Sequence, residues 1–478
     1  MTKNKQIAII LFIISLFSLF CYKQNYFYYN IIALLSCLFA LYLTQFSFFS
    51  FNAILILGHL VQYPLASFLV DSLETKSDSI LESEFSLTVG GMICLTIAMM
   101  GLSIGIMGYK SFFKKNKIFD NKHYFKKTRV SLYLILSLLS CFVLYIIIAI
   151  KTNTYYHSVA GDYDNKFANS YGIIGYLLYF GYVGLGLQCY NYFIFKRKRD
   201  GIVLLIYISI IILLMLPSGS RRFILLPIVL VFVLYINTIK FSIPKLLWVS
   251  FIIIILTISL PLLEYLRNEV NSHGSIFDRM TDAFSLPKFL KDTENTKTLA
   301  LLGRRLSDYT SVGYIYEYLQ YPNGQLIGFT DLLMSPVFLV PTLIRPETML
   351  SFNYDAIIME GIGFRPEIGG SSPTMLIGDF LIRGGLVAVF FGFIFLGFIL
   401  EYMSNKLNPF KSIKGMVIWI MMFDTITSLH TMTILKLFVL FTKQFFLFLI
   451  FAELINYINK RLKKDDKSNE HYLSSDSV

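Results

Sequence analysis

The chain has 478 residues, of which 55% are hydrophobic and only 15% are charged, and its mean hydropathy is +0.63. This composition excludes an ordinary soluble domain, in which about a quarter of the residues are charged. The formal net charge of +12 does not indicate a nucleic-acid-binding protein, because most of the basic residues flank apolar runs and form no basic face of their own.

Apolar runs of about 18 residues or more recur along the chain, and each is long enough to cross a hydrocarbon core of about 30 Å as a helix. The sequence therefore predicts an all-α, polytopic membrane protein with about twelve transmembrane helices. The predicted spans are 6–22, 27–44, 49–70, 86–108, 130–150, 171–195, 201–216, 223–239, 246–263, 374–402, 415–431 and 437–458. No small-residue cleavage site follows the first run, so we expect a retained helix there and not a signal peptide.

The polar connections alternate in charge. Lysine and arginine gather in 110–129, 196–199, 240–245, 406–414 and the C-terminal tail, whereas the connections between them are acidic or nearly neutral. Because short cytoplasmic loops carry the excess of lysine and arginine, we expect both termini in the cytoplasm.

One polar interruption is much longer than the others. It divides the chain into a membrane domain (1–263), a large external loop with interfacial helices between spans nine and ten (264–372), a second membrane domain (373–458) and a cytoplasmic polar tail (459–478). Within the loop, 332–344 is apolar but short and contains two prolines, so we expect an interfacial or re-entrant piece and not a span.

Small residues recur inside two of the predicted spans. Gly101 and Gly105 are four apart in the fourth span, and Gly181, Gly184 and Gly186 lie in the sixth. Such glycines allow close helix packing, which is the favoured interpretation, or they line a substrate groove.

Arg221 and Arg222 follow PSGS at the expected outer end of the seventh span, on the side that otherwise carries few charges. Either they extend to lipid headgroups, or they form an anion site, since guanidinium groups bind phosphate through two parallel hydrogen bonds.

The long loop and the following span supply further candidates. Arg304 and Arg305 precede a tyrosine-rich helix, which would either stack on sugar rings or lie on the membrane surface. Asp379 and Arg383 share one helix face; they either neutralise each other or point into an external cavity, with Gly384 and Gly385 allowing another chain segment to approach.

The sequence contains no Walker motif, no GxSxG motif, no dinucleotide fingerprint and no HExxH motif. His273 is a lone loop histidine, and the five cysteines fit no metal spacing. We therefore expect neither a metal nor a cofactor.

The chain resembles the bacterial oligosaccharide repeat-unit polymerases of the Wzy type, which make O-antigen or capsule. The resemblance rests on PSGSRRFIL at the outer end of a mid-chain span, on the large external loop before the last three spans, and on LIGDFLIRGGLVAVFFGFIFLG. At Arg383, Gly384 and Gly385 this last stretch departs from the family's pattern, in which a polar residue and Phe-Gly are expected.

The resemblance implies a multi-pass protein of the bacterial plasma (inner) membrane that acts on repeat units linked to undecaprenyl diphosphate at the outer face. The growing glycan would move from its lipid diphosphate onto the next lipid-linked unit, so that undecaprenyl diphosphate is the leaving group. Arginines suit the diphosphate charge, which implicates Arg221, Arg222, Arg304 and Arg305, then Arg365 and Arg383. The candidates for the general base are Asp379, Glu360 and His273, in this order.

Membrane lipids and a chain-length regulator are further expected partners. The alternatives are a ligase that transfers finished glycan to another acceptor, followed by a flippase or other transporter. A carrier would show internal pseudo-symmetry and charges near the bilayer midplane, whereas here the loops are lopsided and the charges gather at the outer face.

Overall fold

The protein is described from a computed structural model. The model describes residues 27–45, 47, 49–67, 81–113, 129–151, 172–215, 221–238, 308–322, 324–330, 332–333, 375–407, 409, 412–427, 429, 432–439, 441–442 and 445–475. Within these residues all regular secondary structure is helical, which confirms the predicted all-α class for this part of the chain.

The helices follow the apolar runs closely. In chain order they are α2 (Phe27–Leu43), α3 (Phe51–Leu60), the π-helical turn η1 (Val61–Leu65), α5 (Leu81–Phe112), α6 (Leu132–Lys151), α8 (Gly172–Phe195), α9 (Lys198–Met215), α10 (Arg221–Thr238), α15 (Asp308–Tyr318), α17 (Leu376–Lys406), α18 (Ile413–Thr427), α19 (Ile434–Val439) and α20 (Phe445–Ser475).

Membrane-spanning character is clear for three of the described helices. Thr88–Phe112 within α5, all of α6 and all of α17 are long and apolar enough to cross a membrane. The predicted spans 6–22 and 246–263 and most of the predicted long loop lie outside the described residues. The count of about twelve spans and the position of the loop therefore stay predictions.

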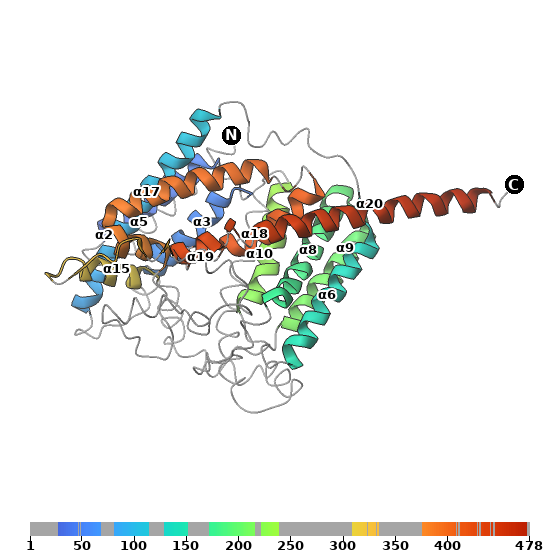
Figure 1. Cartoon of the computed structure of the whole chain (residues 1–478), viewed down its shortest axis with the longest axis horizontal. Helices are drawn as coiled ribbons and strands as arrows, with labels where there is room; N and C mark the ends of the chain where they lie inside the picture. Colours follow the sequence, from blue (N-terminus) through green and yellow to red (C-terminus); the bar gives the residue numbers. More distant parts are fainter. Residues whose placement is uncertain are drawn as a thin grey trace.

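The last predicted span, 437–458, covers the end of α19 and the start of α20, and the described residues 441–442 between them are π-helical. Helix α19 ends at Val439, and α20 begins at Phe445 and continues to Ser475, through most of the predicted polar tail. Figure 1 shows the C-terminal part of α20 projecting beyond the other helices.

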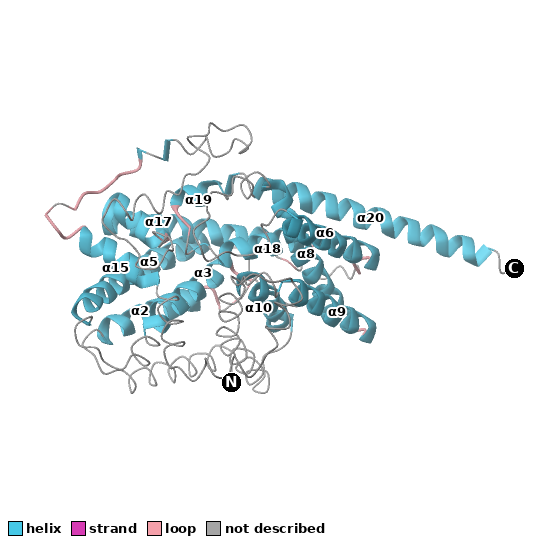
Figure 2. Ribbon diagram, turned by 90° about the horizontal axis from the view of Figure 1, so that it is seen from below, coloured by secondary structure: helices cyan, strands magenta, loops and turns pink. Residues whose placement is uncertain are grey.

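One group of helices, α2, α3, α5, α15 and α17, is centred on the contact between α5 and α17 (Figures 1 and 2). Gly101 and Gly105 lie directly against the backbone of α17, at the carbonyl groups of Phe390 and Ile394. In return, a side chain at Gly397 would lie 2.6 Å from the carbonyl oxygen of Leu102. The two backbones can approach this closely because no Cβ atoms separate them.

A second group contains α6, α8, α9 and α10, with α8 at its centre. Gly181 of α8 lies against the ring of Phe142, Gly184 against Tyr207, and Gly186 against Ile420. The glycines of both groups thus support helix packing, which confirms the favoured interpretation of these residues.

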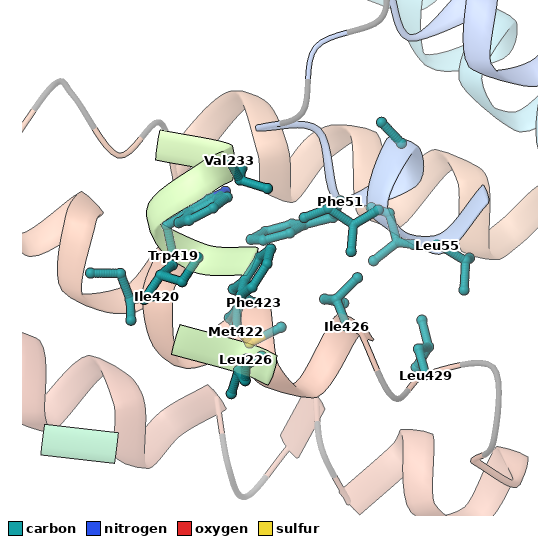
Figure 3. Packing of buried hydrophobic residues seen from close by; sticks show 14 of the residues in the cluster. Phe51, Leu55, Leu226, Val233, Trp419, Ile420, Met422, Phe423, Ile426 and Leu429 are labelled. Atoms are coloured by element: carbon teal, nitrogen blue, oxygen red, sulfur yellow. The ribbon is translucent and has the colours of Figure 1, made fainter. Parts of the chain in front are cut away.

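Helix α18 joins the two groups, since it contacts α3 of the first group and α8 and α10 of the second. Trp419 is fully buried, stacks with both Phe51 and Phe423, and donates a hydrogen bond from Nε1 to the carbonyl oxygen of Phe49 at 3.1 Å. Figure 3 shows these rings in one cluster with Leu226 and Val233 of α10. Three segments far apart in the sequence therefore share one core.

Candidate active site

Asp379 and Arg383 form an ion pair inside the N-terminal part of α17. Arg383 Nε lies 2.8 Å from Asp379 Oδ1, and both side chains are 0% exposed. The i,i+4 spacing places the two groups on one helix face, as the sequence predicts. Because charges removed from water are costly when isolated, each group depends on its partner and on further hydrogen bonds.

Those further hydrogen bonds reach two other segments. Asp379 Oδ2 accepts a hydrogen bond from the backbone N–H of Ile434, the first residue of α19, at 2.7 Å. Arg383 Nη1 donates to the carbonyl oxygen of Gly328 at 3.2 Å. The backbone N–H of Ile327 donates to the carbonyl oxygen of Ile382 at 3.0 Å. The pair therefore holds the segment 324–330 and the start of α19 against α17.

The helical conformation of α17 is interrupted immediately after Arg383. Gly385 has φ +65° and ψ −163°, a backbone conformation that is accessible essentially to glycine alone. At the preceding Gly384, a Cβ atom would lie 3.2 Å from the ring of Phe329. The two glycines thus allow the segment 324–330 to lie against α17, as expected for a close approach of another part of the chain.

Helix α15, the tyrosine-rich helix after Arg304 and Arg305, packs against α5 and α17. Its Tyr309 is buried beside Gly91, and Ile315 lies against Gly378, one residue before Asp379. The packing accounts for one face of this helix, and its remaining tyrosines are partly exposed. Stacking on sugar rings by those tyrosines stays a prediction.

Arg221 and Arg222 are the first two residues of α10, and their side chains lie outside what the structure describes. Further along the same helix, Leu226 lies beside Met422 and Phe423 of α18 (Figure 3). The arginines therefore begin a helix that is anchored in the central core. The N-terminus of a helix carries a partial positive charge and exposes backbone N–H groups that have no partner within the helix. Two arginines at this end therefore strengthen its attraction for an anion.

The remaining predicted site residues, His273, Arg304, Arg305, Glu360 and Arg365, lie outside the described residues. The structure thus brings Asp379 and Arg383 together and does not place the other candidates relative to them. In the described part of the chain, no group of three histidine, cysteine, aspartate or glutamate side chains could hold a metal ion.

Besides Asp200, which pairs with Arg129, two further buried carboxylates of the described residues were not among the sequence candidates. Asp424, in the last turn of α18, is 6% exposed. Glu401, near the other end of α17, accepts a hydrogen bond from Asn52 at 3.1 Å and pairs with Lys110 at 3.6 Å. Both acids interrupt apolar runs, and this signal marks a membrane residue as a functional or structural site.

Asp424 is the more informative of the two for the site. It follows Met422 and Phe423, which Figure 3 shows beside Leu226 of α10, five residues after Arg221. Asp424 therefore adds a buried carboxylate in the last turn of α18, a helix that packs against α10. Glu401 instead joins α3, α5 and α17 at the opposite end of α17.

Comparison with known proteins identifies one family. The family model described as O-antigen polysaccharide polymerase Wzy matches residues 5–331. No curated protein and no solved structure matches the chain. The matched region includes Arg221, Arg222, Arg304 and Arg305, whereas Asp379 and Arg383 lie beyond it.

The match covers more than half of the chain and agrees with the helical membrane character seen in the structure. This family polymerises lipid-linked oligosaccharide repeat units and consists of membrane proteins. The chain therefore belongs to the O-antigen polysaccharide polymerase Wzy family.

Proposed function

We propose that this protein polymerises undecaprenyl-diphosphate-linked repeat units into O-antigen or capsular polysaccharide at the outer face of the plasma membrane. The observation that carries the proposal is the family match over residues 5–331, which contains the arginine pair at the start of α10. The reaction would be a glycosyl transfer without a metal, with undecaprenyl diphosphate as the leaving group.

The chemistry sets two requirements. The bond between the anomeric carbon and the diphosphate oxygen breaks, and a bond forms from the same carbon to a hydroxyl oxygen of the incoming unit. Negative charge develops on the departing diphosphate, and the attacking hydroxyl loses its proton to a base. The transition state is therefore stabilised by fixed positive charge at the diphosphate.

Arg221 and Arg222 meet the first requirement in this proposal. Their guanidinium groups stay charged at any working pH, and the backbone N–H groups of the first turn of α10, which have no partner within the helix, provide further donors for an anion. Anchoring of α10 in the Trp419 core keeps these donors in place (Figure 3). Arg304, Arg305 and Arg365 complete the proposed set of diphosphate and glycan ligands, and Arg383 joins this set only if its buried pair with Asp379 opens.

For the base we keep the order Asp379, Glu360 and His273. Both carboxylate oxygens of Asp379 have protein partners in the described arrangement, Arg383 Nε and the Ile434 N–H. To accept a proton, Asp379 would exchange the Ile434 N–H for a substrate hydroxyl, which requires α19 to move away from α17. In the arrangement seen here the carboxylate positions α19.

The experiment is complementation of a strain that lacks this gene, read from gels of extracted surface polysaccharide. The test variants are Arg221→Ala and Arg222→Ala. The matched control is Lys414→Ala, which removes an exposed cation whose partner is Glu453. Membrane levels of each variant are measured by immunoblot, so that lost activity is separated from lost protein.

We expect single-repeat-unit glycan in the deletion strain, and long chains with the wild type and with Lys414→Ala. The Arg221→Ala and Arg222→Ala variants should yield mainly single units at normal protein levels. Complete loss of surface glycan, with lipid-linked units retained on the inner side, would identify a flippase instead. Long lipid-linked chains that are never transferred to their final acceptor would identify a ligase.

A further inference from the structure

A set of exposed cations gathers where the start of α6, the end of α8 and the start of α9 meet the middle of α20. Lys196, Arg197, Lys198 and Arg199 occupy the turn between α8 and α9 and the first residues of α9, and all four are exposed. Lys460 and Arg461 are exposed on α20. We call these six residues the basic collar.

Hydrogen bonds hold together the helices that carry and border the basic collar. The backbone N–H of Ser131, at the start of α6, donates to Asn459 Oδ1 of α20 at 3.1 Å, directly before Lys460. The neighbouring Val130 N–H donates to Asn191 Oδ1 of α8 at 2.9 Å. The collar therefore belongs to one surface, although its members are more than 250 residues apart in sequence.

The acidic groups of these segments do not neutralise the collar. Residues 129–151, 172–215 and 445–462 contain two acids, Asp200 and Glu453; α20 then continues with Lys463, Lys464, Asp465 and Asp466, whose side chains lie outside the described residues. Asp200 is buried and pairs with Arg129 at 2.5 Å, and its backbone carbonyl accepts a hydrogen bond from Gln188. Glu453 pairs with Lys414. The described part of this surface is thus positive.

Exposed apolar and tyrosine side chains border the collar on every helix that contributes to it. Ile202, Leu205 and Ile206 follow the cations on α9 and are 53–68% exposed. Tyr457 and Leu454 precede Lys460 on α20, and they are 61% and 49% exposed.

The two neighbouring helices, α6 and α8, also carry exposed tyrosines. Tyr133, just after the start of α6, is 68% exposed, and Tyr192, near the end of α8, is 36% exposed. Tyrosine between an apolar belt and a row of cations is the pattern of a membrane–water interface.

We propose that the basic collar binds the phosphate headgroups of anionic phospholipids in the leaflet that it faces, with their acyl chains along the exposed apolar residues of α9 and α6. Under the expected topology this is the cytoplasmic leaflet. The occupant follows from charge complementarity together with the apolar border, since an acidic soluble protein would not match the neighbouring leucine and isoleucine side chains. The inference concerns lipid binding and does not depend on the proposed transfer reaction.

The test uses purified full-length protein in neutral detergent. Dioleoylphosphatidylglycerol or dioleoylphosphatidylcholine is titrated in, and bound lipid is counted by native mass spectrometry while the thermal unfolding midpoint is recorded. The variants are Lys460→Gln/Arg461→Gln and the sixfold substitution of the collar by glutamine. Lys151→Gln, which removes an exposed lysine at the other end of α6, is the control.

A C-terminal fluorescent protein fusion, which is bright only in the cytoplasm, checks that each variant keeps its orientation in the membrane. Each lysine or arginine near an anionic surface strengthens attraction roughly fivefold, so the sixfold variant should bind phosphatidylglycerol at least about 100-fold more weakly. Wild type and Lys151→Gln should prefer phosphatidylglycerol over phosphatidylcholine, and added salt should weaken this preference.

Two results would overturn the proposal. If the wild-type protein binds both lipids equally, the collar serves only to orient the chain or to bind an acidic protein. If the sixfold variant retains the affinity of the wild type for phosphatidylglycerol, the lipid binds elsewhere on the molecule.

Discussion

The pair formed by Asp379 and Arg383 illustrates what a buried charge does in this protein. The opposite charges neutralise each other, yet the remaining hydrogen-bonding capacity extends to Gly328 and Ile434, each 55 residues from its partner. The sequence allowed two interpretations: a pair that neutralises itself, and a close approach of another chain segment at Gly384 and Gly385. The structure shows both the ion pair and the close approach of the segment 324–330. The pair has a positioning role for the segment 324–330 and for α19.

The first prediction concerns Arg383→Ala. Removing one partner of a buried ion pair leaves an uncompensated charge and typically costs about 3–5 kcal/mol. We expect Arg383→Ala to lower the thermal unfolding midpoint of the purified protein clearly. Lys414→Ala, which breaks the exposed pair with Glu453, should change it little.

A double substitution tests the coupling within this pair. Asp379→Ala/Arg383→Ala should destabilise the protein by much less than the sum of the two single changes, because no isolated charge remains. Additive effects would show that the pair does not act as a unit.

The second prediction isolates backbone conformation at Gly385. An added Cβ atom there meets no atom of the described residues within 4 Å, so Gly385→Ala creates no collision with them. The positive φ alone should cost about 1–3 kcal/mol. Gly108→Ala, also in open space but within the continuous helix α5, is the control and should be neutral or slightly stabilising. Equal midpoints for the two variants in a thermal unfolding assay would contradict the interruption of α17 seen at this residue.

Among the helices, the contact between α5 and α17 depends on glycine at the crossing. The four-residue spacing of Gly101 and Gly105 indicates that α5 has a face without side chains, and the partner helix became known only from the structure. Carbonyl oxygens of α17 occupy the positions that Cβ atoms would need. A larger residue must therefore separate the two backbones.

The third prediction follows from this geometry. Gly105→Ala should destabilise the protein by about 1–3 kcal/mol, because the new methyl group meets the carbonyl oxygen of Ile394 and lies 2.9 Å from the backbone nitrogen of Phe398. Gly108→Ala, one turn further along the same helix, serves again as the control. The comparison is made by thermal unfolding in detergent, and a stability of Gly105→Ala equal to that of the control would argue against the close crossing.

For the whole molecule, the Trp419 cluster determines whether the two helix groups behave as one unit. It combines α18 with α3 and α10, and the hydrogen bond from Trp419 to Phe49 adds the segment before α3 (Figure 3). No local pattern indicates this arrangement, because α18 is apolar on nearly every side.

The fourth prediction is that Trp419→Ala destabilises both groups together, by about 3–5 kcal/mol, as expected for the loss of a large buried side chain. Cys94 of α5 and Cys189 of α8 are buried reporters of the two groups. Each cysteine is studied in a variant that lacks the other. In the Trp419→Ala background, maleimide labelling of Cys94 and of Cys189 should begin at the same temperature, which should be lower than in the wild-type background. Earlier exposure of only one cysteine would show that the groups unfold independently. Trp419→Phe should cost only about 1 kcal/mol, mainly for the lost hydrogen bond.

Sequence patterns predicted much of the helical content and only part of the candidate site. Apolar runs marked most described helices to within a few residues, because burial of the backbone in lipid requires helices. The spacing of Asp379 and Arg383 predicted their pairing. Asp424 was missed even though it interrupts an apolar run, and the contacts to Gly328 and Ile434 could not be predicted, because they join segments without a shared local signal.

Composition and periodicity alone determined the class of protein: a chain with this hydropathy and so few charges forms membrane helices whatever their arrangement. The tertiary structure alone decided which helix lies against which glycine and which buried acid pairs with which cation. It also brought the basic turn between α8 and α9 close to the basic residues in the middle of α20. The physical reason is that secondary structure depends on short-range backbone and side-chain preferences, whereas packing and ion pairing depend on contacts between residues distant in the sequence.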